Sequence, residues 1–594
     1  MYSESLLMPL VFRLTVATLL LSSLIIVLSC GERPATNAPV EVKTPDVTSG
    51  VRGGEITYRL AGAPTTFNYL LAEDEPTIII TLYLLTSRLI EFDHKTQQFV
   101  PGLAESWAPD GDGKTVNVKL REGLMFSDGE ALTADDVIFT LNAIYDERSQ
   151  ASGLRDAMLV DDDPIAAKKL DDRNLQLIFP KAVASVENYL INLGVMPEHV
   201  LKADFDAGKL AGSWKITTQP AAVVSSGPFV VVKTAAGQRV EFARNPHYYK
   251  TDNKGTQLPY LDKLNIEVIE DANKAFVDLS RGAVDLADKI RPTDFAELTK
   301  NGGAIVAKDA GPGLGVDYIW FNLNAADTKD KPLTNQVKRG WFGDRRFRQA
   351  IASAVDRDSI ATNTLQGLAT PLHGFVSPAN KMWAKKDLVT INYDLAAAEK
   401  SLTEAGFQKR GNPESPILYD AQNNVVEFSL AVQIESEARK LAAAVIQQDL
   451  AKLGIKMSVV PIETGALMDK WTKSYDYDAI LLGIAQGDTE PSSYQNFLLS
   501  SGALHQWQPD QKTPVSEWEA KIDKLFDEMT TTRDMKTRYQ LFANIQDIVR
   551  DELPVIPIVA RHVPSAANSK IGNWSPSSIL PYSIWNVEQL YIKP

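Results

Sequence analysis

Hydrophobic and polar residues alternate at every second position in several parts of the chain, which is the pattern of a half-buried strand. One such stretch covers residues 115–120, where Val116, Val118 and Leu120 are separated by polar side chains. The same kind of pattern, or a short apolar run bounded by turn residues, predicts strands at 54–60, 175–179, 230–232, 239–243, 264–268, 316–322, 455–459 and 553–559.

Apolar residues three and four positions apart predict helices between these strands. The clearest start is at Thr133, which can cap a helix from Ala134 because Asp136 can complete a capping box with it. Further helices are expected around Leu279, from Asp344 to about 356, from Asp394 to a stop at Gly406, and from Ser436 to a stop at Gly454. Strands that alternate with helices predict the α/β class.

Composition narrows the class of protein. The 594 residues are too many for one core, so two or more domains are expected. The share of hydrophobic residues, 44%, is that of a soluble globular protein. A net charge of −14 without a basic block predicts no nucleic-acid partner.

The N-terminus resembles a lipoprotein signal. Arg13 precedes an apolar run over 14–28, and the run ends at Ser29-Cys30, where Cys30 is the single cysteine of the chain. We therefore predict a signal peptide over residues 1–29 and a lipid on Cys30 that anchors the protein to a membrane. An uncleaved anchor is the alternative, but the run is short for a span of about 20 residues. One cysteine also excludes intrachain disulfides.

Six short blocks between residues 91 and 137 occur in a characteristic order. They are Glu91-Phe92-Asp93, Pro101-Gly102-Leu103-Ala104-Glu105-Ser106-Trp107, Asp112-Gly113-Lys114-Thr115, Leu120-Arg121-Glu122-Gly123, Phe126-Ser127-Asp128-Gly129 and Leu132-Thr133-Ala134-Asp135-Asp136-Val137. With Gly227-Pro228-Phe229 and Arg244-Asn245-Pro246-His247-Tyr248 further on, this order resembles the family 5 extracellular solute-binding proteins, the oligopeptide, dipeptide and nickel receptors of bacterial ABC importers (cluster C periplasmic binding proteins).

The resemblance implies a fold and a layout of domains. The fold is α/β, a two-lobed periplasmic binding protein type II fold with an extra inserted domain, so that three discontinuous domains are expected. After the signal peptide, the layout comprises a flexible tether (30–53), lobe I (54–90 with 220–317 and 552–594), inserted domain II (91–219) and lobe III (318–551).

Motifs for catalysis or metal binding are incomplete in this chain. Gly311 to Val316 resembles a dinucleotide-binding loop, but Val316 stands where the last glycine is required and Pro312 spoils the turn. The six histidines are scattered, and no Gly-x-Ser-x-Gly or His-Glu-x-x-His motif occurs. We therefore predict neither an enzyme nor a resident metal or cofactor. The arginines of helix 344–356 (Arg345, Arg346 and Arg348) could bind an anion, but a solvated face or pairing with local carboxylates is expected.

The resemblance also points to ligand-binding residues. In the peptide receptors of the family, the stretch that corresponds to 482–494 carries an aspartate that pairs with the ligand's α-ammonium. Asp488 matches that position, with Gln486 and Tyr494 as further candidates, whereas Trp320 is expected in the core. Ile484 stands where peptide receptors carry tryptophan. An ordinary aspartate that caps a turn is the alternative for Asp488.

These observations predict a monomeric receptor at the periplasm or cell surface. It would capture a peptide-like solute between two lobes and deliver it to the transmembrane subunits of an ABC permease. A receptor of the same fold for an oligosaccharide or a metal chelate remains open, as does a secreted hydrolase. The identity of the solute, the cognate permease, the membrane that carries the anchor and a signalling role are also open.

Overall fold

The computed structural model describes residues 48–594 except 112, 325–335, 485–488 and 510. Its main feature is an 11-stranded mixed sheet in the order β17-β16-β18-β12-β19-β11-β1-β10-β9-β8, with β13 paired to β19. The strands are β1 (Glu55–Leu60), β8 (Phe229–Ala235), β9 (Arg239–Arg244), β10 (Lys263–Val268), β11 (Leu286–Ala287), β12 (Ile305–Phe321), β13 (Ala369–Pro371), β16 (Glu427–Gln433), β17 (Lys456–Ile462), β18 (Ala479–Ile484) and β19 (Val555–Asn568).

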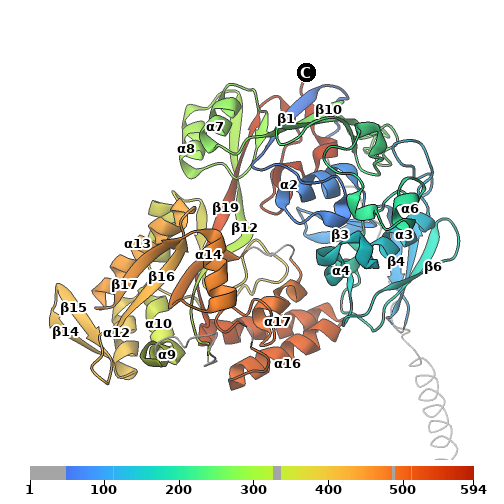
Figure 1. Cartoon of the computed structure of the whole chain (residues 1–594). Coiled ribbons are helices and arrows are strands. Elements are labelled where there is room, and N and C mark those ends of the chain that lie inside the picture. Colours follow the sequence, from blue (N-terminus) through green and yellow to red (C-terminus); the bar gives the residue numbers. More distant parts are fainter. Residues whose placement is uncertain (1–47, 112, 325–335, 485–488, 510) are drawn as a thin grey trace, which may run out of the picture. The chain divides into compact units, whose positions relative to one another are not determined.

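Two strands are much longer than the others. The antiparallel pair β12 and β19 has 17 and 14 residues, and Figure 1 shows it running from the neighbourhood of β1 into that of β16. Their register shifts between Asp309 and Pro312 and again between Pro312 and Val316. Bulges of this kind let a strand accommodate proline and glycine without ending. The predicted strands at 316–322 and 553–559 are therefore the halves of β12 and β19 that pair with each other near β18.

A second sheet of four antiparallel strands lies within residues 104–178, in the order β4-β5-β7-β6. Its strands are β4 (Ala104–Pro109), β5 (Thr115–Leu120), β6 (Ala166–Lys169) and β7 (Asn174–Ile178). Two-stranded ladders are formed by β2 (Ile90–Asp93) with β3 (Gln98–Pro101), by β14 (Gln408–Asn412) with β15 (Ser415–Tyr419), and by β20 (Ile571–Gly572) with β21 (Tyr591–Ile592). Alternating burial along β5 confirms the strand predicted at 115–120.

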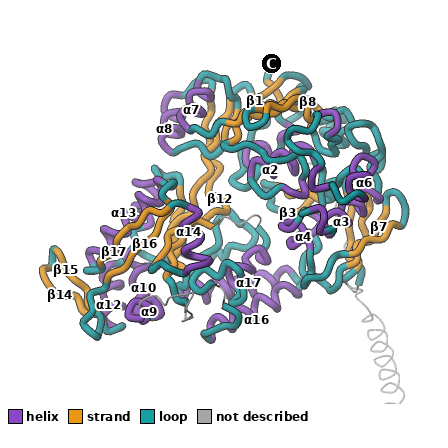
Figure 2. The backbone as a smooth tube through the Cα atoms, in the orientation of Figure 1, coloured by secondary structure: helices purple, strands orange, loops and turns teal. Residues whose placement is uncertain are grey.

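Helices cover the sheets (Figure 2). The longer ones are α3 (Ala134–Tyr145), α6 (Glu198–Asp206), α7 (Ala272–Ser280), α8 (Pro292–Asn301), α9 (Gln336–Gly343), α10 (Arg345–Ala354), α12 (Leu395–Glu404), α13 (Glu437–Lys452), α16 (Glu517–Thr531) and α17 (Met535–Glu552). Shorter ones are α2 (Glu75–Ile78), α4 (Ser152–Met158), α5 (Glu187–Leu190), α11 (Arg357–Ser359), α14 (Thr464–Asp469) and α15 (Gln495–Leu498). None of the helices within these described ranges has the length and apolar character needed to cross a bilayer.

The predicted caps are confirmed. Thr133 and Asp136 form a capping box at α3, Asp394 accepts a hydrogen bond from the backbone of Ala397 at α12, and Ser436 caps α13. Gly454 follows α13 with a φ of +82°, the left-handed conformation that favours glycine. The arginines at the start of α10 pair with carboxylates, Arg346 with Asp344 and Arg345 with Glu552, as predicted.

The sheet that contains β16–β18 has a hydrophobic core on each face. Ile319 and Phe321 of β12 pack on one face with α10 and α13, whereas Tyr318 and Trp320 point to the other face, with α16 and α17. Trp320 is fully buried, which confirms its predicted core position. Residues 48–53 contact the folded body, with the Gly53 amide donating to the Tyr260 carbonyl at 2.8 Å.

Candidate functional site

The carboxyl ends of three parallel strands meet at one edge of the large sheet. β16 ends at Gln433, β17 at Ile462 and β18 at Ile484, and β12 and β19 continue past this edge. Open α/β sheets bind their ligands outside the carboxyl ends of such strands. We therefore take this edge, beside the two long strands, as the candidate site.

A buried ion pair stands at the edge. Arg439, in the first turn of α13, places its Nε 3.0 Å and its Nη2 2.9 Å from Oδ1 of Asp317 on β12, and both side chains are less than one-tenth exposed. Arg439 also donates to the side-chain carbonyl of Gln433. Burial lowers the pKa of Arg439, the Asp317 carboxylate opposes this effect, and the nearby charge of Arg561 adds to it.

Gly483 of β18 lies directly beneath this ion pair. A Cβ at Gly483 would overlap both the guanidinium of Arg439 and the carboxylate of Asp317. Glycine is therefore the residue that lets an ion pair lie against the backbone at the end of β18.

A second guanidinium shares the same carboxylate. Arg561 of β19 places its Nε 3.4 Å from Oδ2 of Asp317, and its side chain is 44% exposed, whereas the side chain of Asp317 is 7% exposed. Asp317 pairs with Val559 across β12 and β19, and Arg561 follows Val559 by two residues, so both charged groups lie on one face. The cluster Asp317–Arg439–Arg561 thus contains one negative and two positive charges.

The neighbouring His562 is engaged on both ring nitrogens. Its Nδ1 lies 2.6 Å from Oδ2 of Asp309, and its Nε2 lies 2.8 Å from Oγ1 of Thr370. For Arg561, in contrast, no hydrogen bond donated by the two terminal Nη groups occurs within the described part of the chain. Of the two adjacent polar residues on β19, Arg561 is therefore the one with free donors.

The segment that follows the predicted ligand stretch is fixed by buried polar groups. Asn380 donates from Nδ2 to the Thr489 carbonyl at 2.7 Å, and Glu490 forms an ion pair with the buried Arg538. Arg538 also lies over the ring of Trp383, 5.1 Å from the centroid. These contacts anchor the chain from Thr489 onward to α17 and to the loop before α12.

The predicted site residues have different outcomes. Gln486, Asp488 and the lipid-attachment residue Cys30 lie outside the described residues, so their assignments stay predictions. Tyr494 is 2% exposed and packs against the rings of Phe375 and Phe542. The structure does not test the ligand role of Tyr494.

Sequence reasoning missed Asp317, Arg439 and Arg561. Their one local signal is Arg561 itself, a cation directly after the apolar strand that was predicted at 553–559. A cluster of three or more His, Cys, Asp or Glu side chains suited to a metal ion is absent from the residues that the structure describes.

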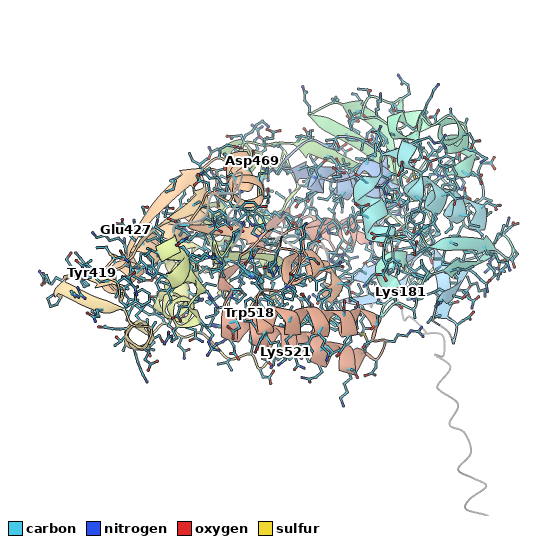
Figure 3. All side chains as sticks on the ribbon, turned by 60° about the horizontal axis from the view of Figure 1, so that its bottom comes forward. Lys181, Tyr419, Glu427, Asp469, Trp518 and Lys521 are labelled. Carbon is cyan, nitrogen blue, oxygen red and sulfur yellow. The ribbon has the colours of Figure 1, made fainter. Side chains whose placement is uncertain are left out.

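Two cavities lie at the opposite edge of the same sheet. One of about 560 Å³ is lined by Leu323, Trp507, Trp518 and Glu519, and one of about 320 Å³ by Glu427, Met457 and Asp478. Trp518 of α16 and Glu427 of β16 are labelled in Figure 3. Since β16 and β17 begin at this edge, these cavities are not at the carboxyl ends of the strands.

Comparisons with known proteins agree with the fold. A family model described as bacterial extracellular solute-binding proteins, family 5 Middle, matches residues 98–506. The oligopeptide-binding protein AppA of Bacillus subtilis is 26% identical over 509 residues, which cover 85% of each chain.

Solved structures share the fold. The ABC transporter substrate-binding protein CtaP of Listeria monocytogenes superimposes with a TM-score of 0.74 at 23% identity, covering 91% of this chain and all of that one. NikA of Brucella suis, solved in complex with Fe(III)-EDTA, gives a TM-score of 0.74 at 20% identity with the same coverage.

Such receptors bind solutes for transport and are not enzymes, which sets aside the hydrolase alternative. The match covers more than half of the sequence, and the predicted blocks between residues 98 and 137 lie within it. The chain therefore belongs to the bacterial extracellular solute-binding proteins of family 5.

Proposed function

We propose that this solute-binding receptor captures a peptide-like solute between two lobes and delivers it to the transmembrane subunits of an ABC permease. The proposed domains are those expected above: lobe I (54–90, 220–317 and 552–594), inserted domain II (91–219) and lobe III (318–551). The observation that carries the proposal is the pair β12–β19, which joins the proposed lobes at the carboxyl edge of β16 and β18.

Contacts between distant segments support a closing motion. The side-chain amide of Gln97, in the β2–β3 turn, donates to the Ala379 carbonyl at 2.7 Å and accepts from the Lys381 amide at 2.9 Å. A state in which both lobes touch the ligand is selected because the ligand gains contacts to both only there. Gln97 would contribute to that state a contact between the proposed domain II and lobe III.

The peptide assignment rests on the resemblance to peptide receptors and on AppA. In this proposal, Asp488 pairs with the α-ammonium of the ligand, and Gln486 and Tyr494 lie near it. A partly desolvated carboxylate and an ammonium form a strong, charge-assisted hydrogen bond. Backbone groups would carry much of the remaining affinity for an extended peptide, which gives tolerance to its side chains.

We further propose that a lipid on Cys30 tethers the receptor, as a monomer, at the periplasmic or outer face of a membrane. The apolar run at 14–28 and the Ser29-Cys30 pair support this. Metabolic labelling with a fatty acid should mark the wild type and not Cys30→Ala. Labelling of both would contradict the assignment.

The main test is to incubate the purified protein with a defined peptide mixture. Native mass spectrometry should detect a stoichiometric complex, and bound peptide should raise the melting temperature. Mass spectrometry of the mixture should find the peptides unaltered. For a peptide with a free amino terminus, unchanged affinity in Asp488→Ala would exclude the ammonium assignment, and Asp476→Ala, an exposed carboxylate in the loop before β18, is the control.

A receptor for a metal chelate or an oligosaccharide is the second candidate. Ile484, at the end of β18, favours it, because peptide receptors of the family carry tryptophan at this position. The same native mass spectra decide between the two. A retained chelate or glycan, with no binding from the peptide mixture, would replace the peptide proposal.

A further inference from the structure

Positive charge exceeds negative charge in the cluster Asp317–Arg439–Arg561. Asp317 accepts from Arg439 through Oδ1 and lies beside Arg561 through Oδ2, so a single carboxylate serves two guanidiniums. Gln433 of β16 and Gly483 of β18, which contact the cluster, are uncharged. One positive charge is therefore not neutralised within the cluster.

The excess charge is accessible at Arg561. Arg439 is buried, and its guanidinium is used by Asp317 and Gln433, whereas the side chain of Arg561 is 44% exposed. Its Nε lies 3.4 Å from Asp317, and the two Nη groups, which donate no hydrogen bond within the described part of the chain, form a fork of donors. A planar fork of this kind matches a carboxylate and can bind it through two parallel hydrogen bonds.

The position of Arg561 is fixed by its strand. Its backbone lies in β19, where it is paired with Ala369 of β13, and Val559, two residues earlier on the same strand, is paired with Asp317. Because Asp317 is itself held by Arg439, the orientation of Arg561 is set by a buried group. A donor held in this way loses less conformational entropy on binding than one on a free side chain.

We propose that Arg561 is a specificity-determining residue that binds a carboxylate of the solute, so that the receptor selects anionic ligands. This rests on the proposed function: for a peptide, the group is its C-terminal carboxylate. Asp317 and Arg439 act as positioning residues, since they hold Arg561 without contacting the solute.

The test compares each peptide with its C-terminal amide, by isothermal titration calorimetry on the full chain. A charge-assisted pair predicts that the wild type binds the free acid about 10- to 100-fold more tightly than the amide. In Arg561→Gln this preference should disappear, because acid affinity falls to the amide level while amide affinity stays within about twofold. Arg345→Gln is the matched control, since Arg345 is also half exposed and also lies 3.2 Å from a carboxylate, that of Glu552.

The outcomes are distinguishable. If the wild type binds acid and amide equally, or if Arg561→Gln keeps the preference, the carboxylate assignment is wrong while the peptide receptor stands. If the wild type binds no peptide of either kind, the peptide function fails and this inference fails with it. Loss of the preference in Arg561→Gln but not in Arg345→Gln supports the assignment.

Discussion

Two ionic clusters of this structure have opposite compositions. In one, Nζ of Lys250 lies 2.6 Å from Oε2 of Glu91 and 3.1 Å from Oε1 of Glu588, so one cation serves two carboxylates. In the other, Asp317 serves Arg439 and Arg561. The first joins three distant segments of the chain, and the second stands at the carboxyl edge of the sheet.

The clusters differ most in the exposure of their outer members. The side chains of Glu91 and Glu588 are 23% and 10% exposed, and Tyr249 donates a further hydrogen bond to Glu91 at 3.0 Å. Arg561 is 44% exposed. We infer that the closed cluster, Lys250 with Glu91 and Glu588, stabilises the fold. The open cluster, Asp317 with Arg439 and Arg561, is available to a ligand. The following predictions test this distinction.

The largest effect is expected for Lys250→Met. Removal of the ammonium leaves two mostly buried carboxylates without the counter-ion that they share, which should lower the free energy of unfolding by about 3–5 kcal/mol. Urea unfolding followed by circular dichroism measures the change. The control is Lys254→Met, at an exposed lysine in the next turn, which should change it by less than about 0.5 kcal/mol.

A smaller effect is expected for Arg439→Met. Asp317 then loses its best partner but keeps Arg561, so the free energy of unfolding should fall by about 2–3 kcal/mol. Lys440→Met, on the same helix and paired with the exposed Glu437, is the control. A loss of unfolding free energy as large as that of Lys250→Met would show that Arg561 does not compensate the negative charge of Asp317.

Acid should reduce the contribution of the Lys250 cluster to stability. Burial alone would raise the pKa of Glu91, but the charge and hydrogen bond of Lys250 lower it overall. For Lys250, burial alone would lower the pKa, but the charges of Glu588 and Glu91 raise it well above its ordinary value. A carboxylate whose pKa is lowered on folding stabilises the fold when the pH is above its pKa in the unfolded state. It loses this contribution as the pH falls through its pKa in the folded state.

The destabilisation by Lys250→Met should therefore shrink on acidification. Between pH 7 and pH 3 the difference in free energy of unfolding between wild type and variant should narrow, because the wild type loses the contribution of Glu91 as the pH falls below the ordinary pKa of 4.5. Urea unfolding at both pH values measures it. A difference that is independent of pH would mean that Lys250 contributes by packing and not by charge.

The local parts of this structure were predictable from the sequence. The capping box of Thr133 and Asp136 and the stop at Gly454 depend on neighbours within a few residues, so the pattern alone specifies them. The family blocks also predicted the fold class, because their order along the chain is itself characteristic of the family.

The length of β12 was not predictable in the same way. The stretch from Gly311 to Gly315 contains the residues that normally end a strand, and the pattern placed the strand only from Val316. In the structure, β19 pairs with both sides of this stretch and bulges absorb Pro312. Tertiary pairing thus overrides the local preference.

The cluster at the candidate site was not predictable either. Asp317, Arg439 and Arg561 come from two strands and a helix that are more than a hundred residues apart, and each is an ordinary charged residue in its own segment. Only the register of β12 against β19, and the glycine at 483, bring them together.

The smallest effect on stability is expected for Arg561→Gln, and it bears most directly on the comparison. Asp317 keeps the hydrogen bond and the ion pair with Arg439, and the lost partner is half exposed at 3.4 Å, where an ion pair contributes less than about 1 kcal/mol. The free energy of unfolding should therefore change by less than about 0.5 kcal/mol, because glutamine can still donate to Oδ2. If urea unfolding instead gives a loss comparable to that of Arg439→Met, Arg561 belongs to the closed kind of cluster, and its exposed donors are not held ready for a ligand.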